Sequence, residues 1–130
     1  MTEPVWIDKL AILFAQAEVL AEHGGAEGVR DEGLLESALA RPRNLFAYEG
    51  IEDVSRLAAS YAVGIARNHP FVDGNKRVAF IALALFLALN GARLKADQAD
   101  AFRQIYGVAS GEIREEQLAV WVRQNTGKPK

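Results

Sequence analysis

Apolar residues recur at helical spacing along most of this chain, and short breaks that contain glycine or proline separate the runs. The first run follows Asp8, which can cap a helix, and stops at Gly24-Gly25. One apolar stripe is expected to face the core in this first helix: Ile7, Leu10, Ala11, Phe14, Ala17 and Ala21.

A second, shorter helix is expected to begin at a cap on Asp31 and to end at Pro42. Proline disfavours helical geometry in the residue before it, which is why the helix should stop there. Its apolar face consists of Leu34, Leu35, Ala38 and Leu39. The next segment, 43–50, has no clear period and is therefore predicted as a loop or a small hairpin.

Two longer helices are expected on either side of a break at His69-Pro70. The first runs from Glu52 to Asn68, and its stripe consists of Val54, Leu57, Ala58, Tyr61, Ala62, Ile65 and Ala66. The second starts near Asn75 and stops at Asn90-Gly91. Its stretch 78–89 is apolar on every side, which predicts the central helix of a bundle.

Two more helices complete the pattern. Asp97 can cap a fifth helix that carries Phe102, Ile105, Tyr106 and Ala109. Glu115 and Glu116 favour the start of a sixth, whose inward residues are Leu118, Trp121 and Val122. No segment alternates apolar and polar residues over the length of a strand. The sequence therefore predicts a compact all-α domain of about six helices over residues 4–125, followed by a flexible C-terminal tail, 126–130.

Composition narrows the function classes. With 130 residues the chain has the size of one domain, and its lack of cysteine excludes a disulfide scaffold, a thiolate zinc site and a cysteine nucleophile. The net charge of −2 argues against general nucleic-acid binding. The run 78–89 is too short to span a bilayer, and the acidic start 1–4 does not resemble a signal peptide. We expect a soluble cytoplasmic protein that binds neither membranes nor nucleic acids directly.

The candidate chemistry is concentrated in the segment 69–77, His-Pro-Phe-Val-Asp-Gly-Asn-Lys-Arg, at the start of the fourth helix. A helix N-terminus has unpaired N–H groups and a partial positive charge, so it attracts anions. Gly74 allows close approach of a ligand, Arg77 can bind phosphate oxygens through two bonds, and Lys76 adds a point charge. These residues predict a phosphate site.

Two further side chains of the segment suggest a reaction. Asp73 would repel phosphate, but it suits Mg²⁺, which proteins often hold with one or two carboxylates and the phosphates of the substrate. His69 can accept a hydroxyl proton, and Asn75 can hold a phosphate oxygen or brace the turn. Each residue alone also has a structural interpretation, since Asp-Gly-Asn is a good turn and helix-cap sequence and Lys-Arg is often only solvated.

The same segment resembles the signature of the Fic/Doc (Fido) superfamily, His-Pro-Phe-x-Asp/Glu-Gly-Asn-Gly-Arg-x-x-Arg, which lies on a helix–loop–helix of an all-α fold. Seven positions match in register: His69, Pro70, Phe71, Asp73, Gly74, Asn75 and Arg77. Lys76 replaces a glycine and Phe80 replaces the second arginine. Lysine at the glycine position, and the upstream stretch 29–42, are similar to the Doc (death-on-curing) branch.

The resemblance implies the toxin half of a toxin–antitoxin pair. Doc-type toxins present the γ-phosphate of ATP where Fic enzymes present the α-phosphate, and they phosphorylate a threonine of elongation factor Tu and so stop translation. The implied cofactors are ATP and Mg²⁺. The implied partner is an antitoxin of the prevent-host-death type, whose disordered C-terminal segment folds on the toxin. By motif position His69 is the implied general base and Asp73 the Mg²⁺ ligand, while Gly74, Asn75, Lys76 and Arg77 hold the phosphates.

Three expectations stay open at this point. The segment 43–50, with Phe46, Ala47 and Tyr48, lies where the family has a flap that aligns the target polypeptide, but it can equally be an ordinary surface loop. The reaction can be transfer of AMP, as in Fic enzymes, although the missing second arginine speaks against it. The chain can also be a helical binding module without catalysis, although His69 and Asp73 are both present.

Overall fold

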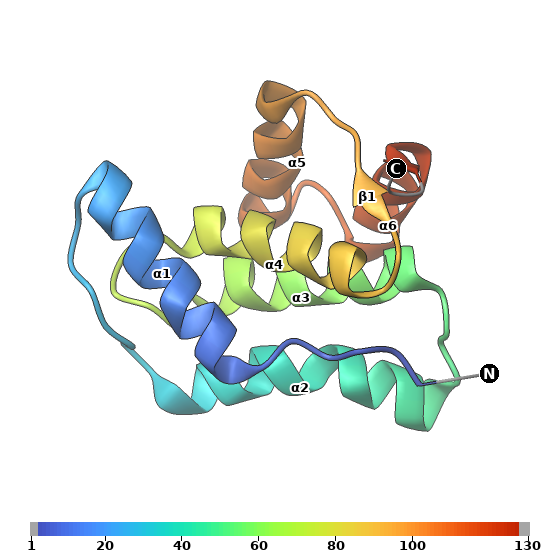
Figure 1. Cartoon of the computed structure of the whole chain (residues 1–130), viewed down its shortest axis with the longest axis horizontal. Helices are drawn as coiled ribbons and strands as arrows, with labels where there is room; N and C mark the ends of the chain where they lie inside the picture. The colour runs from blue at the N-terminus through green and yellow to red at the C-terminus, as the bar shows by residue number, and fades with distance from the viewer. Residues whose placement is uncertain (1–2, 128–130) are drawn as a thin grey trace.

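The described part of the computed structural model, residues 3–127, contains six α-helices and one small sheet. In chain order the elements are α1 (Lys9–His23), α2 (Glu32–Glu49), α3 (Val54–Asn68), α4 (Asn75–Leu89), β1 (Arg93–Leu94), α5 (Gln98–Ser110), α6 (Glu115–Gln124) and β2 (Thr126–Gly127) (Figure 1). The predicted all-α architecture is confirmed. The two strands pair antiparallel, so Thr126 and Gly127 belong to a sheet and not to a tail. Residues 128–130, also expected in that tail, lie outside the described residues.

The central helix is α3, not α4 as the sequence predicted. Helix α3 contacts α2, α4, α5 and α6, and every residue from Leu57 to Ala66 is buried. Helix α4 runs beside α3 (Figure 1), but Ile81 and Leu85 are only half-buried and Leu89 is exposed. Apolar character on all sides therefore did not mark the innermost helix. Helix α3 has neighbours on more sides, and Gly64 lets α2 approach it so closely that an added Cβ would lie 3.1 Å from Ala38. No helix within residues 3–127 is long and apolar enough to cross a membrane.

Helix α1 presents a different face to the core from the predicted one. The Asp8 cap is present, with the side chain accepting a hydrogen bond from Leu10 N–H, and the helix ends at Gly24 as expected. However, Leu10 and Phe14 are 72% and 66% exposed. The buried residues are Ile12, Ala15, Gln16, Val19 and Leu20. Because α1 is apolar on two sides, the spacing alone could not decide which side packs against α4.

Helix α2 continues through Pro42, so the predicted stop is wrong. It begins at the expected Asp31 cap and ends at Gly50, which has a left-handed backbone (φ 66°). Proline removes one helical hydrogen bond and normally bends or ends a helix. Here the ring is buried on the face that also contains Leu35, Ala38 and Leu45, and this packing against α3 offsets the loss. The segment 43–50 is therefore mostly helix, not a loop or hairpin.

Tyr61 of α3 joins the N-terminal segment to the core. Its ring packs against Phe86 of α4 with centroids 5.2 Å apart, and Trp6 stacks on Phe86 with centroids 5.8 Å apart. The hydroxyl oxygen of Tyr61 accepts a hydrogen bond of 3.1 Å from the N–H of Ile7. Burial raises the pKa of Tyr61 above its usual value, so the hydroxyl stays neutral in the folded protein.

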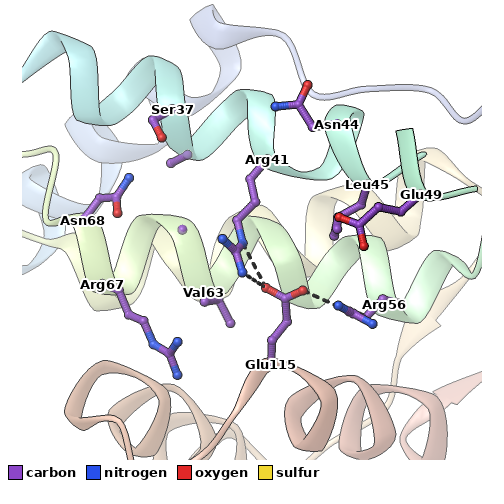
Figure 2. A pocket seen from close by; sticks show the side chains of 12 residues that line it. Ser37, Arg41, Asn44, Leu45, Glu49, Arg56, Val63, Arg67, Asn68 and Glu115 are labelled. Atoms are coloured by element: carbon purple, nitrogen blue, oxygen red, sulfur yellow. Dashed lines mark hydrogen bonds and ion pairs between the residues drawn. The ribbon is translucent and has the colours of Figure 1, made fainter. Parts of the chain in front are cut away.

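A buried carboxylate anchors α6 to α2 and α3. A cavity of about 470 Å³ lies between these helices, and Glu115 extends into it (Figure 2). The carboxylate, only 4% exposed, accepts hydrogen bonds from Arg41 at 2.6 and 2.9 Å and from Arg56 at 2.9 Å. Arg67 instead donates to the carbonyls of Val108 and Ile113, at the end of α5 and beyond it. The arginines of this cavity thus serve to hold the helices together.

We expect Glu115→Gln to lower the free energy of unfolding by about 2 kcal/mol, because it leaves two guanidinium groups without their carboxylate. This loss of stability is smaller than for a wholly buried ion pair, since water reaches Arg41 and Arg56. Chemical denaturation measures it. The matched control is Glu116→Gln, whose exposed carboxylate lies 3.6 Å from Arg56 and should contribute less than about 1 kcal/mol. Equal losses in the two variants would contradict the assignment.

Candidate functional site

The candidate site is built on the loop that joins α3 to α4. His69 caps the C-terminus of α3 with a left-handed backbone (φ 52°), the one positive φ outside glycine among residues 3–127. Such a conformation costs a non-glycine residue energy and persists where its surroundings fix it. The Arg30 side chain supplies part of that constraint, because it donates to the carbonyls of Asn68 at 3.0 Å and His69 at 2.8 Å.

The segment 24–31, between α1 and α2, lies against this loop along its length. The N–H groups of Arg30 and Asp31 both donate to the carbonyl of Pro70, at 2.7 and 3.1 Å. The N–H of Val72 donates to the carbonyl of Gly28 at 3.0 Å, and Val29 and Phe71 form an antiparallel bridge. The loop is therefore held by backbone pairing with a segment that was not predicted to belong to the site.

Asn75, buried at the start of α4, braces the turn from inside. Its side-chain oxygen accepts from the N–H of Phe71 at 2.9 Å, and its amide nitrogen donates to the carbonyl of Phe71 at 3.0 Å. The same nitrogen lies 3.4 Å from Nδ1 of His69. Of the two predicted roles for Asn75, the structure thus shows the bracing one, and it brings the amide next to the imidazole.

The N-terminus of α4 is open to a ligand. Aspartate side chains cap α1, α2 and α3. No side chain caps the first turn of α4, which Gly74 precedes, or that of α5, where the expected cap residue Asp97 makes no such hydrogen bond. The free N–H groups of the first turn of α4 can bind an anion. Gly74 also has a left-handed backbone (φ 82°), and an added Cβ would come within 3.3 Å of Val19. The backbone conformation therefore favours glycine here, and a side chain would also have to displace Val19 slightly.

A cavity of about 270 Å³ brings most of the predicted residues together. It is lined by His69, Val72, Asp73, Gly74, Asn75, Lys76, Arg77 and Tyr106. Nζ of Lys76 lies 5.6 Å from the centre of the Tyr106 ring, and the Arg77 guanidinium lies 5.1 Å from the centre of the Phe102 ring. Aromatic rings of α5 thus support both cations at the edge of the cavity.

The Asp73 carboxylate is exposed at this cavity, and one of its oxygens, Oδ2, accepts a hydrogen bond of 2.8 Å from the N–H of Ala26. No cluster of three or more His, Asp or Glu side chains that could hold a metal occurs in the described residues. One carboxylate beside a phosphate site is still a suitable donor set for Mg²⁺, which keeps waters and takes ligand phosphates as its other partners. The residues present therefore fit this ion.

Phe80 stands where the family signature has its second arginine. Its ring packs against Phe102 with centroids 5.6 Å apart, next to the Arg77 guanidinium. This position contributes an apolar contact, so Lys76 and Arg77 are the cations that the first turn of α4 offers to a phosphate.

The predicted flap is not part of the site. Phe46, Ala47 and Tyr48 belong to the last turns of α2, close to the start of α3, whereas His69 follows the other end of α3. At 1.5 Å per residue, the 15 residues of α3 separate the two by about 20 Å. Phe46 packs edge-on against Trp6, and Tyr48 is 84% exposed. The segment next to the site is 24–31. Its glycines, and the Doc-like stretch that begins at residue 29, are the signals in the sequence that could have indicated it.

A pair of adjacent glycines in that segment allows a direct test. At Gly25 (φ 119°) an added Cβ would lie 3.0 Å from Leu20 and 3.2 Å from Cβ of Asp73, whereas at Gly24 (φ 80°) it would meet nothing within 4 Å. In both Gly→Ala variants the alanine must adopt a strained backbone with positive φ. We expect Gly25→Ala to lower the free energy of unfolding by about 1–3 kcal/mol more than Gly24→Ala, because only the former is overpacked. Denaturant unfolding measures the difference; equal values would refute the close contact with Asp73.

Comparison with known proteins agrees with this geometry. The Fic/DOC family model matches residues 6–87, which include α1 to α3, the loop and most of α4. The chain is 35% identical over 108 residues to "Protein kinase doc" of Escherichia phage P1, an alignment that covers 83% of this chain and 85% of that protein. It is 47% identical over 77 residues to "Toxin Doc" of Mycolicibacterium smegmatis, covering 57% of this chain and 58% of that protein. The chain belongs to the Fic/DOC family, in its Doc branch.

Proposed function

We propose that this protein is the toxin of a toxin–antitoxin pair and that it transfers the γ-phosphate of ATP to a hydroxyl group of a protein. The observation that carries the proposal is the uncapped N-terminus of α4, with Lys76 and Arg77 in its first turn and His69 and Asp73 at the same cavity. Two Doc relatives support it by their names, one a protein kinase and the other a toxin.

In the proposed reaction the residues of this chain bind, orient and accept a proton. The free N–H groups of α4, with Lys76 and Arg77, bind the phosphates and balance the charge that spreads over them in the transition state. Asp73 holds Mg²⁺, which neutralises phosphate charge when it is bound. His69 accepts the proton of the hydroxyl as its oxygen bonds to the γ-phosphorus, and the bond from that phosphorus to the ADP oxygen breaks, so that ADP leaves with the electron pair.

Lys76 and Phe80 favour phosphate transfer over AMP transfer. The second arginine of the signature helps Fic enzymes hold the nucleotide, and here an apolar ring packed against Phe102 takes its place. Lys76 adds bulk and charge where the signature has glycine. These two changes give a physical reason for the nucleotide to bind in the other orientation, with its γ-phosphate towards His69.

We propose a threonine of elongation factor Tu as the acceptor, translation arrest as the result and the cytoplasm as the location. The support is the Doc-type resemblance, which rests on the signature segment and on the stretch 29–42. The exposed position of His69 is consistent with a macromolecular acceptor, because a side chain of another protein can reach it.

The proposed partner is an antitoxin of the prevent-host-death type, whose disordered C-terminal segment folds on the toxin. An apolar groove between α1 and α4 suits such a segment, and Leu10, Phe14, Ile81 and Leu85 line it. An exposed apolar surface of this kind is typical of an interaction site. Binding of the antitoxin segment there would give the second apolar side of α1 a function.

Transfer of label from ATP to protein tests the function. Purified protein is added to a bacterial translation extract with Mg²⁺ and with ATP labelled at either the γ- or the α-phosphate. We expect label from γ-labelled ATP alone, on a protein that mass spectrometry identifies as elongation factor Tu. Label from α-labelled ATP would instead show AMP transfer. No label with either form, although the protein still stops translation in the extract, would indicate a binding module.

A further inference from the structure

One polar side chain is buried in the otherwise apolar core face of α1. Gln16 is 2% exposed and shares this face with Ile12, Ala15, Val19 and Leu20. Burying an amide is costly unless its donors and acceptor are hydrogen-bonded. The partners of Gln16 therefore show what its burial achieves.

The amide of Gln16 joins the segment 24–31 to the loop before α4. Its oxygen accepts from the N–H of Gly28 at 3.2 Å, and its nitrogen donates to the carbonyl of Asp73 at 3.1 Å. The carbonyl of Gly28, in turn, accepts from the N–H of Val72 at 3.0 Å and lies 3.5 Å from the same amide nitrogen. One side chain thus bridges two backbone segments that both flank the cavity.

Asp73 is consequently held from two sides. Gln16 fixes its backbone carbonyl, and the N–H of Ala26 fixes its carboxylate at 2.8 Å. Ala26 and Gly28 belong to one short segment, so Gln16 contacts both the backbone of Asp73 and the segment that binds its carboxylate.

We propose that Gln16 is a positioning residue that sets the Asp73 carboxylate for Mg²⁺. The inference rests on the proposed function in that it takes Asp73 as the Mg²⁺ ligand. Gln16 touches neither nucleotide nor metal; it acts through the segment 24–31 and the backbone of Asp73. Groups that orient a metal ligand typically change metal affinity by about 10- to 100-fold when they are lost.

The test compares Gln16→Leu with the wild-type protein by amide hydrogen exchange and by Mg²⁺ titration. Leucine fills the buried position without hydrogen bonds. We expect the amides of Ala26, Gly28 and Val72 to exchange about tenfold faster, while α3 is unaffected. We also expect the Mg²⁺ concentration at the midpoint of binding, followed by NMR in the presence of a non-hydrolysable ATP analogue, to rise about tenfold or more.

Two further variants keep the test decisive. Glu115→Gln loses stability at a site remote from the loop, so it should leave both the exchange of these three amides and the Mg²⁺ midpoint unchanged. Gln16→Met keeps the length and flexibility of the side chain and replaces Gln16→Leu should the latter fail to fold. If Gln16 has only a structural role, its variants should resemble Glu115→Gln, with lower stability and an unchanged Mg²⁺ midpoint. This result would overturn the proposal.

The result for Gln16 can be distinguished from the result for the proposed phosphate transfer. Should the wild-type protein bind Mg²⁺ and the analogue yet transfer no phosphate, the proposed reaction fails, whereas the Mg²⁺ midpoint still decides the role of Gln16. Should the wild-type protein bind no Mg²⁺ with the analogue, both fail. Faster exchange in Gln16→Leu with an unchanged midpoint refutes the positioning role alone.

Discussion

Replacing His69 by asparagine is expected to reduce phosphate transfer by about 100- to 10,000-fold, the contribution of a general base. Asparagine cannot accept the hydroxyl proton, but it tolerates the left-handed backbone that residue 69 adopts (φ 52°) better than alanine does. The free energy of unfolding should therefore change little, which separates a chemical effect from a folding defect. Transfer from γ-labelled ATP and thermal unfolding of the same preparation measure the two quantities.

Growth of bacteria that express the His69→Asn variant gives an independent readout. If the protein is a kinase toxin, we expect the variant to be harmless and still to bind its antitoxin. A variant that remains as toxic as the wild-type protein, although it transfers no label, would show that binding alone causes the toxicity and would favour the non-catalytic module.

The second large effect is expected for Asp73→Asn, which keeps the shape of the side chain and an oxygen for the N–H of Ala26 but removes the charge that holds Mg²⁺. A bound metal contributes several kcal/mol to phosphate chemistry, so the rate should fall at least about a hundredfold. Raising the Mg²⁺ concentration should restore part of it. A titration of the transfer rate with Mg²⁺ measures both effects.

The control for Asp73→Asn is Glu27→Gln. Glu27 is exposed on the segment 24–31, close in the chain to Ala26, so its replacement removes the same charge from the same part of the surface. It should leave the Mg²⁺ dependence unchanged. Equal effects of the two substitutions would mean that only the net charge of the region matters, and Asp73 would then be no metal ligand.

Much of the fold could be predicted because local signals agreed with the tertiary structure. Asp8 and Asp31 cap the helices that follow them, and Gly24 ends α1 with a positive φ. The errors occurred where packing overrode a local preference. At Pro42, burial against α3 outweighed one missing hydrogen bond, and in α1 two apolar faces left the orientation undecided until α4 was in place.

Some residues of the site could be predicted from the sequence, and others could not. The residues 69–77 are contiguous, so their proximity was certain from the chain itself, and the cavity contains all of those proposed to act on phosphate. The segment 24–31 was missed because it acts through its backbone: N–H and carbonyl groups of Ala26, Gly28 and Arg30 pair with the loop. Gln16 was missed because its contacts depend on which face of α1 is buried.

The central claim is that the N-terminus of α4 binds the phosphates of a Mg²⁺-bound nucleotide. The most direct test is NMR of the backbone amides during titration with Mg²⁺ and a non-hydrolysable ATP analogue. The account predicts saturable shifts that are largest for the N–H groups of residues 74–77, since these are the free donors. Absence of shifts at millimolar analogue, or shifts confined to the cavity around Glu115, would contradict it.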